Sequence, residues 1–249
     1  MRPVLFASDL HLSAARPDRV EQALALLAHC RTHAGAVYLL GDLVEFWLGD
    51  DDDDRVHRRL VDALASLVSA GVTVSLTVGN RDFLVGQRFA AETGVGLLDD
   101  YTLIDLFGTP TLLTHGDLLC VKDIRYQEFR RTVREPGRQA QFLALPLAER
   151  RRIATATRTD TQKSMLDKDE YIMDVDADEV TRALSAHGAR RLVHGHTHRP
   201  AVHPLDLDGT RAERVVLGDW YGAGEVYWVT AGGARLLPAA TLSAELARP

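Results

Sequence analysis

The chain has 249 residues, of which 46% are hydrophobic, and this is enough for one sizeable α/β domain with a full core. Its formal net charge of −6 and its pI near 5.9 argue against a general nucleic-acid-binding protein, which would normally be basic. We therefore expect no nucleic acid among its partners. Cys30 and Cys120 are too few and too isolated for a disulfide framework, which favours a reducing compartment.

The beginning of the chain, MRPVLFASDLH, brings an acid and a histidine before any long apolar run can form, so we expect no secretory signal of the usual kind. Elsewhere the sequence never approaches the ~20 consecutive apolar residues that a membrane-spanning helix needs. We expect a protein that is soluble or, at most, attached to a membrane surface.

The N-terminal part of the chain predicts strands and helices in alternation. Short apolar runs at 4–7, 36–40 and 72–78 predict buried strands, and a polar loop follows each of them. Helical spacing predicts helices over 18–32, with an aspartate at its start suited to capping, and over 56–70. This alternation indicates a βαβ layout whose polar loops gather at the C-terminal ends of the strands.

From residue 101 onward, residues 120–175 excepted, the sequence predicts mainly strands. They lie at 101–107, 110–114, 199–207, 211–217, 223–230 and 233–238, separated by glycine-containing turns, with the first pair forming a hairpin around Gly108-Thr109. Two sheets with helices outside them would account for both halves. The sequence shows no internal repeat, and we predict a single domain over residues 1–249.

Residues 120–175 differ in character from the rest of the chain. Tyr126, Phe129 and Val133 share a helical face, and Pro136-Gly137 predicts a break in the helix. Residues 120–170 hold 12 lysines and arginines against 8 acids, a balance of +4 in a chain of net charge −6. Composition alone favours an ordinary solvated helical hairpin. The alternative is a helical cap with an apolar groove and a basic rim, suited to an amphiphilic anion.

Five short motifs with metal-binding side chains fall where predicted strands end. They are Asp9-Leu10-His11, Gly41-Asp42, Gly79-Asn80-Arg81-Asp82, His115-Gly116-Asp117 and His194-Gly195-His196-Thr197-His198. Together they offer oxygen and imidazole ligands and no cysteine, which suits Mn²⁺, Fe or Zn²⁺ in a hydrolase better than a structural zinc held by thiolates. In the first and last motifs, the two ligands stand two positions apart and so point to the same side of an extended segment.

The candidate ligands are too many for one ion. They are Asp9, His11, Asp42, Asn80, His115, His196 and His198. Such a set suits two ions about 3.5–4 Å apart that share a bridging carboxylate, an arrangement that activates water and neutralises charge on a phosphoryl group. Each motif alone is weak evidence, because a Gly-Asp pair is commonly a plain turn. Their joint appearance is hard to explain as a structural accident.

Other polar clusters have simpler interpretations. The run Asp50–Asp54 lacks the ligand and glycine spacing of an EF-hand, and we interpret it as a solvated loop that begins the next helix. Five histidines outside the motifs are interpreted as surface or satisfied core residues. They are His29, His33, His57, His187 and His203.

The five motifs, in this order, resemble those of the calcineurin-like metallophosphoesterases: D-x-H, G-D, G-N-H-[DE], H and G-H-x-H. The resemblance implies an α/β (α+β) fold, a β-sandwich of two mixed sheets flanked by helices, with metals at the strand ends. It also implies two ligand sets that share Asp42 as the bridge. The first set is Asp9, His11, Asp42 and His198, and the second is Asp42, Asn80, His115 and His196.

Arg81 departs from the general pattern, since most members have a histidine there that is often assigned as the general acid. An arginine is always protonated and cannot donate a proton in this way. It can bind a phosphate bidentately and stabilise developing negative charge. This favours a leaving group that needs little protonation, such as the phosphate monoester released from a pyrophosphate.

Longer blocks resemble the UDP-2,3-diacylglucosamine diphosphatase family over essentially the whole chain. The most specific is Gly79-Asn80-Arg81-Asp82 followed by Tyr126-Gln127-Glu128-Phe129-Arg130. This resemblance implies hydrolysis of UDP-2,3-diacylglucosamine to UMP and 2,3-diacylglucosamine 1-phosphate, a step of lipid A synthesis, with two divalent ions that are usually Mn²⁺. It implies a cytoplasmic enzyme held peripherally on the inner-membrane surface. We expect a monomer without an obligate protein partner.

The same resemblance implies roles for individual residues. Water held near Asp42 attacks the α-phosphorus, while Arg81 and His196 stabilise the charge. Residues 120–175 correspond to the helical cap of the family, which holds the acyl chains. The implied substrate contacts are Asn80, Arg81, Asp123, Thr161, Met165, Lys168 and His196, with Thr161 where many members have serine and Met165 where many have asparagine.

Two alternative functions stay open. The first is another phosphoesterase of the same superfamily, acting on a soluble nucleotide, a phosphoprotein or a nucleic acid; Arg81 and the cap argue against it. The second is a non-catalytic scaffold that keeps the fold without the metals. Such a scaffold would be expected to lose ligands, and here all the motif ligands are present.

Overall fold

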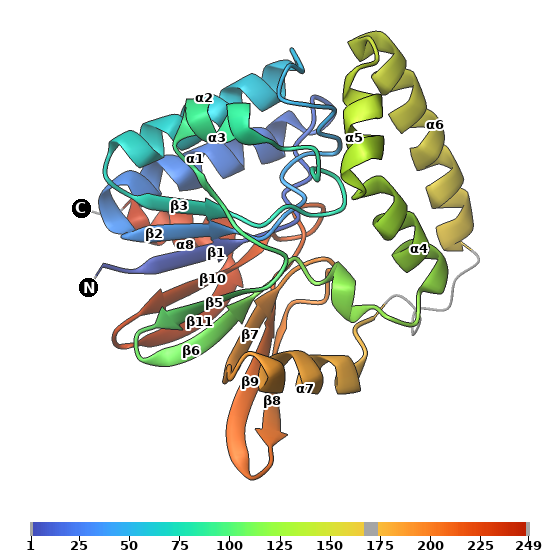
Figure 1. Cartoon of the computed structure of the whole chain (residues 1–249). Coiled ribbons are helices and arrows are strands. Elements are labelled where there is room, and N and C mark those ends of the chain that lie inside the picture. The colour runs from blue at the N-terminus through green and yellow to red at the C-terminus, as the bar shows by residue number, and fades with distance from the viewer. Residues whose placement is uncertain (1, 167–173, 248–249) are drawn as a thin grey trace.

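A computed structural model describes residues 2–166 and 174–247, with side chains described for 2–157 and 174–247. Two sheets lie face to face, with helices on their outer sides (Figure 1). A cluster of buried residues from both sheets, including Phe6, Leu113 and Val215, fills the space between them. The predicted sandwich of two mixed sheets flanked by helices is therefore confirmed.

The first sheet has six strands in the order β11-β10-β1-β2-β3-β4. They are β1 (Val4–Ala7), β2 (Ala36–Leu39), β3 (Thr73–Leu76), β4 (Gly96–Leu97), β10 (Glu225–Thr230) and β11 (Gly233–Pro238). Strands β1 to β4 are parallel, as the alternation of strands and helices predicts, whereas β10 pairs antiparallel with both β1 and β11. Parallel pairing brings the C-terminal ends of β1, β2 and β3 to the same edge.

The second sheet has five strands in the order β5-β6-β7-β9-β8. They are β5 (Thr102–Leu106), β6 (Thr109–Leu113), β7 (Arg191–His194), β8 (Ala201–Leu207) and β9 (Thr210–Val216). Strands β6, β7 and β9 are parallel neighbours, and β5 and β8 pair antiparallel at the two edges. The C-terminal ends of β6 and β7 thus meet at one edge, like those of the first sheet.

Helices cover the outer faces of both sheets. On the first sheet lie α1 (Pro17–His33), α2 (Arg55–Ser69), α3 (Gln87–Thr93) and α8 (Ala239–Leu246), and on the second lies α7 (Ala177–Ala186) (Figure 1). Helix α2 is amphipathic and buries Leu60, Leu64 and Leu67 against the first sheet. No helix within the described ranges is long and apolar enough to cross a bilayer.

Local details differ from the predictions at three points. Helix α1 starts at Pro17, whose fixed φ suits the first helical position, so Asp18 lies in the first turn and pairs with Arg16 instead of capping. The hairpin turn is centred on Phe107 and Gly108, with φ of 53° and 84°, as a tight turn with two left-handed residues requires. Pro136-Gly137 does not merely break a helix, because Pro136 begins the next one.

Three helices, α4 (Ile124–Val133), α5 (Pro136–Leu143) and α6 (Leu147–Leu166), form a separate layer beside the strand ends (Figure 1). We call them the cap helices. Helix α5 buries no residue, α4 buries only Arg130, and apolar side chains such as Ile124 and Phe129 are 65% and 43% exposed. In their described residues these helices bury few side chains, as composition favours, and they also present apolar side chains. The cap boundaries at 120 and 175 stay a prediction.

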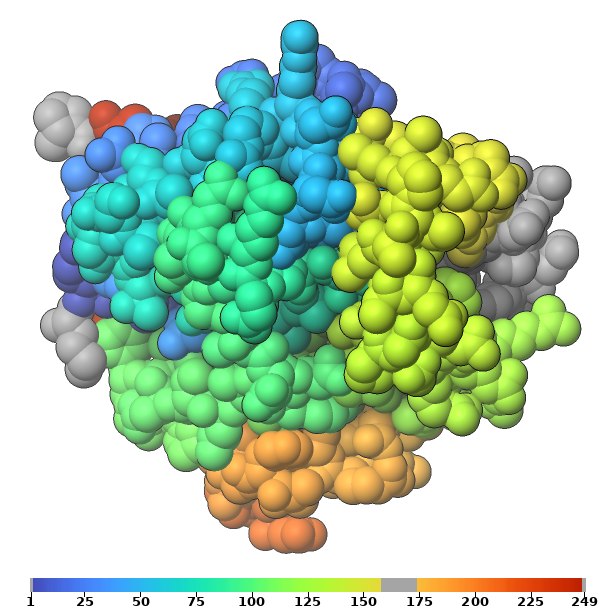
Figure 2. Space-filling model, turned by 45° about the horizontal axis from the view of Figure 1, so that its top comes forward, coloured from blue at the N-terminus to red at the C-terminus, as the bar shows by residue number. Residues whose placement is uncertain are grey.

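Residues 50–54, which we call the acidic loop, lie in contact with the cap helices on the surface of the core. Arg150, itself 2% exposed, donates to the carbonyl of Leu48 at 2.5 Å and to Asp51 at 2.8 Å. Arg151 donates to Asp52 at 2.7 Å. In Figure 2 the segment around residue 50 lies directly against the yellow helices. The loop begins α2 as predicted, because Asp54 caps that helix, but it is not simply solvated: it is the contact surface of the cap helices.

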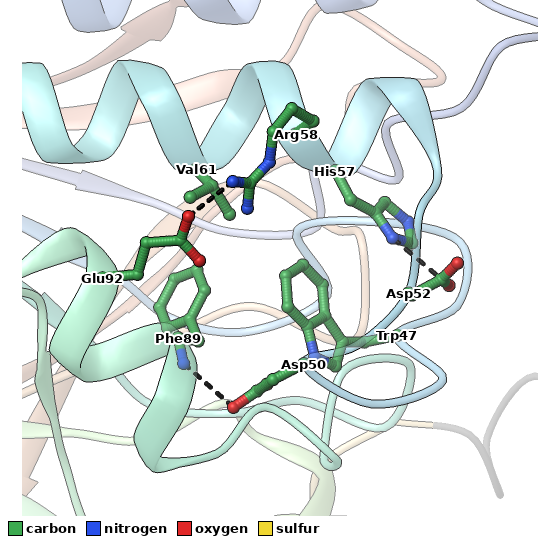
Figure 3. A pocket seen from close by; sticks show the side chains of 8 residues that line it. All are labelled: Trp47, Asp50, Asp52, His57, Arg58, Val61, Phe89 and Glu92. Carbon is green, nitrogen blue, oxygen red and sulfur yellow. Dashed lines mark hydrogen bonds and ion pairs between the residues drawn. The ribbon is translucent and has the colours of Figure 1, made fainter.

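Beneath the acidic loop lies a small polar pocket of about 10 Å³, with room for little more than one water (Figure 3). The Trp47 indole stacks on His57 with ring centroids 5.0 Å apart, and His57 lies 3.5 Å from Asp52. Asp50 accepts from the Trp47 indole at 2.9 Å and from the backbone N–H of Phe89 at 2.9 Å. The loop is thus fixed from below before the cap helices contact it.

Candidate metal centre

The seven candidate ligands come together at the edge where the strand ends of both sheets meet. Asp9 and His11 follow β1, Asp42 follows β2, Asn80 follows β3, His115 follows β6, and His196 and His198 follow β7. These strands lie far apart in the sequence, but the sandwich brings their C-terminal ends to one place. The clustering that the motifs predict is therefore present in the structure.

The ligand atoms form two groups with Asp42 between them. In one group, the His198 Nε2 atom lies 3.2 Å from Asp9 Oδ1 and 3.4 Å from His11 Nε2. One Asp42 oxygen, Oδ2, lies 4.0 Å from His11 Nε2, and the other, Oδ1, lies 3.7 Å from His115 Nε2. One carboxylate thus faces both groups, as a bridging ligand must.

The second group contains His115, Asn80 and His196. The Asn80 Oδ1 atom lies 3.0 Å from His115 Nε2 and 2.9 Å from His196 Nδ1, and these two nitrogens are 3.2 Å apart. The His115 Nδ1 atom lies 2.7 Å from the carbonyl of Leu40 and must donate its proton there. The Nε2 lone pair therefore faces the centre, where a bound cation would accept the lone pairs of both His115 and Asn80.

A similar outer partner orients His198. Its Nδ1 atom lies 2.9 Å from the carboxylate of Asp219, which leaves Nε2 directed toward Asp9 and His11. Metal-binding histidines typically have such a carboxylate or carbonyl partner on the other ring nitrogen. Asp219 was not among the residues predicted from the sequence. Its signal was available, because Leu217-Gly218-Asp219 follows β9 as Gly41-Asp42 follows β2.

Burial makes the centre unfavourable for its own charges. Asp9, Asp42 and His115 are all at most 2% exposed. Burial raises the pKa of Asp42 to about 7, and while His115 opposes this shift, repulsion from Asp82 and Asp9 adds to it. A bound divalent cation removes such a penalty, since it becomes the largest local charge. The donor set of carboxylate, amide oxygen and imidazole fits divalent metal ions.

Backbone strain is concentrated at the same residues. Asp9, His11, Asp42, His196 and His198 have φ between 44° and 66°, a region that non-glycine residues rarely adopt. Strain of this kind costs about 1–3 kcal/mol per residue and persists where function requires the geometry. The surrounding structure therefore holds the ligands in place at a cost to stability.

The motif glycines allow the ligand loops to approach each other. A Cβ atom on Gly195 would lie 2.1 Å from Asp9 Oδ2, and one on Gly79 would lie 2.2 Å from Asp42 Oδ1. Neither contact is possible for a real side chain, so each position requires glycine. Asp82, fully buried, accepts from the N–H groups of Gly79 and Leu43 at 2.6 and 2.8 Å and fixes two ligand loops together.

Arg81 lies at the edge of the centre, with its N–H donating to Asp42 Oδ1 at 2.8 Å. Its Nε atom is buried and has no hydrogen-bond partner among the described atoms. Buried polar groups are normally paired, so this nitrogen is available to an anion beside the metal centre. Its position agrees with the phosphate-binding role that the sequence predicts.

The remaining predicted contacts fall in or near the cap helices. Asp123 caps α4 by accepting from the N–H of Tyr126 at 3.1 Å, and the Tyr126 ring lies 5.7 Å from that of His196. The structure describes the backbone of Thr161 and Met165, which lie in α6, but not their side chains. Lys168 lies outside the described residues altogether. For these three residues the substrate contact stays a prediction.

Tyr126 also belongs to a buried network that sequence analysis missed. Its hydroxyl donates to Asp117 at 2.6 Å, and Arg130 donates to Asp117 and to Asp100 at 2.7 Å each. Charges from His115, His196 and Arg130, together with the Tyr126 hydroxyl, outweigh burial and hold the pKa of Asp117 well below its usual range. The network attaches α4 to the loop that carries His115.

Comparison with known proteins agrees with this geometry. The calcineurin-like phosphoesterase family model matches residues 2–200. The chain is 47% identical to a UDP-2,3-diacylglucosamine hydrolase of Aeromonas hydrophila, over 93% of this chain and 96% of that protein. It is 48% identical to the enzyme of that name from Cellvibrio japonicus, over 88% and 92% of the two chains, and 45% identical to that of Pseudomonas aeruginosa, over 94% and 98%. The chain belongs to the calcineurin-like phosphoesterase family.

Proposed function

We propose that the protein hydrolyses the pyrophosphate bond of UDP-2,3-diacylglucosamine and releases UMP and 2,3-diacylglucosamine 1-phosphate, a step of lipid A biosynthesis. The observation that carries this proposal is the 45–48% identity, over nearly the full length of each protein, to relatives named for this hydrolysis. The complete set of motif ligands around Asp42 supports it, because a non-catalytic scaffold has no need for them.

The proposed ligands are the seven motif residues, with Asp42 as the bridge. Two divalent ions bound there would supply an activated water and neutralise the charge of the pyrophosphate. We propose Mn²⁺ for both, as the family resemblance implies, because carboxylate, amide and imidazole ligands by themselves suit several divalent ions. The bridging role of Asp42 rests on its two oxygens, which lie 4.0 Å from His11 Nε2 and 3.7 Å from His115 Nε2.

The proposed reaction is an in-line attack of water on the α-phosphorus. The bond from this phosphorus to the bridging oxygen breaks, UMP keeps the oxygen of the water, and the sugar 1-phosphate leaves. Arg81 and His196 hold the phosphates and stabilise the charge that develops on them. A phosphate leaving group is a weak base and needs little protonation, which is consistent with an arginine at position 81.

Substrate recognition completes the proposal. The sugar and its phosphate would contact Asn80, Arg81, Asp123, Thr161, Met165, Lys168 and His196. The cap, proposed as residues 120–175 within a single domain of residues 1–249, would hold the acyl chains, and exposed Ile124, Phe129 and Leu143 offer apolar surface for them. The same surface supports peripheral attachment to the cytoplasmic face of the inner membrane, by a monomer without an obligate protein partner.

The test is product analysis on UDP-2,3-diacylglucosamine in ¹⁸O water, with and without Mn²⁺. We expect Mn²⁺-dependent release of UMP that carries the ¹⁸O. Label in the sugar phosphate instead would refute attack at the α-phosphorus. Comparable rates on bis-p-nitrophenyl phosphate would refute the assigned substrate.

A variant pair tests Arg81. Arg81→Met should lower kcat/KM by about 10²–10³-fold, the range seen when one donor to a developing negative charge is removed. Arg88→Met, on the exposed side of α3, is the matched control and should leave kcat/KM unchanged. Equal activity of the two variants would remove Arg81 from the mechanism.

A further inference from the structure

A groove of about 490 Å³ opens beside the metal centre, on the side of His11. We call it the side groove. Its walls include Arg16 from the loop before α1, Glu45 and Phe46 from the segment after β2, Arg151 from α6, and Tyr221. Its volume lies within the range of about 300–1,000 Å³ that is typical of small-molecule sites. None of these residues is among the predicted ligands or substrate contacts.

The side groove adjoins the metal centre at Tyr221. The Tyr221 ring stacks on the His11 imidazole, with centroids 5.0 Å apart and an angle of 17° between the rings. The Tyr221 hydroxyl donates to the carboxylate of Glu45, which places this carboxylate close to His11 as well. A ligand whose phosphate lies at the centre therefore meets Tyr221 and Glu45 first as it extends into the groove.

The two ends of the metal centre face different surroundings. At the end formed by Asn80, His115 and His196, the neighbour is Tyr126 of the cap helix α4. At the end formed by His11, the neighbour is Tyr221 of the side groove. A substrate with a central pyrophosphate has one half on either side of the centre. If the acylated sugar lies toward α4, the nucleoside lies toward the side groove.

The chemistry of the groove suits a nucleoside better than an acyl chain or a second phosphate. Its carboxylates disfavour a hydrocarbon chain, which gains nothing from charged walls. Its arginines already have acidic partners: Arg16 pairs with Asp18, and Arg151 pairs with Asp52. The groove also presents the Phe46 ring and the Glu45 carboxylate. Proteins use such groups to stack a base and to accept hydrogen bonds from the hydroxyls of a ribose.

We propose that the side groove binds the uridine of the substrate, with the uracil against Phe46 and the ribose hydroxyls on Glu45. This assignment rests on the proposed function, which supplies the uridine nucleotide. It makes Phe46 and Glu45 binding residues for the half of the substrate that lies away from α4. Tyr221 orients the Glu45 carboxylate and separates the ribose from His11.

Calorimetric titration of the Mn²⁺-loaded protein tests the base contact, with UMP and ribose 5-phosphate as the two probes. We expect UMP to bind at least about tenfold more tightly than ribose 5-phosphate, since stacking of one base supplies this much. Phe46→Leu, which keeps the apolar volume but removes the aromatic face, should weaken UMP binding and leave ribose 5-phosphate unchanged. Leu103→Ala, at an exposed position of β5, is the control and should change neither.

The ribose contact is tested with UMP and dUMP. The wild-type protein should prefer UMP, because dUMP lacks the 2′-hydroxyl that would donate a hydrogen bond to Glu45. In Glu45→Ala this preference should disappear, whereas the exposed Glu128→Gln on α4 should keep it. Thermal unfolding of each variant confirms that the fold is retained. For any variant that fails to fold, chemical-shift mapping of UMP on the wild-type protein replaces it, and shifts away from Phe46 and Tyr221 refute the groove.

These outcomes separate the groove from the proposed function. If UMP and ribose 5-phosphate bind equally well, or if Phe46→Leu does not discriminate between them, the nucleoside does not occupy the groove, even where the acylated nucleotide is hydrolysed normally. If UMP binding follows the expected pattern but UDP-2,3-diacylglucosamine is not hydrolysed, the groove stands and the proposed substrate is wrong.

Discussion

The metal centre and the cap helices are stabilised in opposite ways. At the centre, buried side chains are fixed by backbone groups and by outer partners, such as Leu40 for His115 and Asp219 for His198. In the cap helices, α5 buries no residue, although its Phe142 packs against the core, and charged pairs from Arg130, Arg150 and Arg151 link the helices to the core. The first region is built on the sandwich, and the second is attached to it.

The difference matches what each region is proposed to do. Hydrolysis needs reacting groups held within a fraction of an ångström, which rigid strand ends and strained loops provide. Acyl chains are flexible and have no directional groups, so their binding needs apolar surface more than fixed geometry. If the two regions are independent in this sense, a mutation in one should leave the other intact.

The largest effect is expected from Asp42→Ala. Activity should fall by on the order of 10³-fold or more, above the 10–100-fold typical for loss of an outer partner of a metal ligand. The protein should also retain less metal, while its folded structure and cap helices persist. Activity assays, elemental analysis and circular dichroism measure the three quantities.

The control for this prediction is Asp62→Asn, an exposed carboxylate on α2, which should change none of them. Wild-type turnover by Asp42→Ala with a full complement of metal would contradict the bridging assignment.

A smaller effect, on the other region, is expected from Arg150→Met. This change removes the pair with Asp51 and leaves the carbonyl of Leu48 without its donor, so the free energy of unfolding should fall by about 1–3 kcal/mol. KM for the acylated substrate should rise, and metal content should stay at the wild-type level. Denaturant titration and steady-state kinetics provide the measurements.

The neighbouring Arg152→Met is the matched control for Arg150, because the Arg152 guanidinium is exposed and its side chain pairs only with Glu149 among the described residues. It should be close to wild type in both assays. Loss of metal in Arg150→Met would show that the two regions are coupled.

Sequence patterns predicted the metal centre better than the attachment of the cap. The ligands sit directly after strands whose apolar runs are visible in the sequence, and parallel pairing then brings the ends of those strands together. Arg150 and Asp51 are 99 positions apart, and nothing in local periodicity selects this pair among the many charges of the chain. Their contact depends on how the helices lie against the finished sandwich.

Helices α7 and α8 were both absent from the sequence prediction, for different reasons. Helix α7 had a usable signal, since Asp176 caps it and Glu179 follows three residues later. Helix α8 had none, because Pro238 precedes it and no side chain caps it. Its position is set by packing of Ala239 and Leu242 into the core beneath the first sheet, which only the folded structure reveals.

A still smaller effect is expected from pH on the acidic loop. The hydrogen bond from Arg150 lowers the pKa of Asp51 from the usual 3.8, so its stabilising contribution is fully present above pH 3.8 and is lost as the pH falls below it. The pair is partly exposed, so the difference in unfolding free energy between wild type and Asp51→Asn should be only a few tenths of a kcal/mol near neutral pH.

Thermal unfolding of both proteins between pH 7 and pH 3 measures this difference, which should begin to shrink as the pH falls below 3.8. A difference that grows on acidification would mean that Asp51 is not ionised in the folded protein.

The smallest effect compares Cys30, in the core of the sandwich, with Cys120, in the segment that leads into the cap helices. Burial raises the pKa of both thiols, to about 12 for Cys30 and about 12 for Cys120, so both should react slowly with a thiol reagent near neutral pH. Cys30 lies in α1 within the core, whereas the carbonyl of Cys120 is held by Gln127 of α4. Because α4 is attached mainly by charged pairs, Cys120 should react faster than Cys30, each measured with the other replaced by serine. Equal rates, or a faster Cys30, would mean that the segment leading into the cap helices opens no more readily than the core.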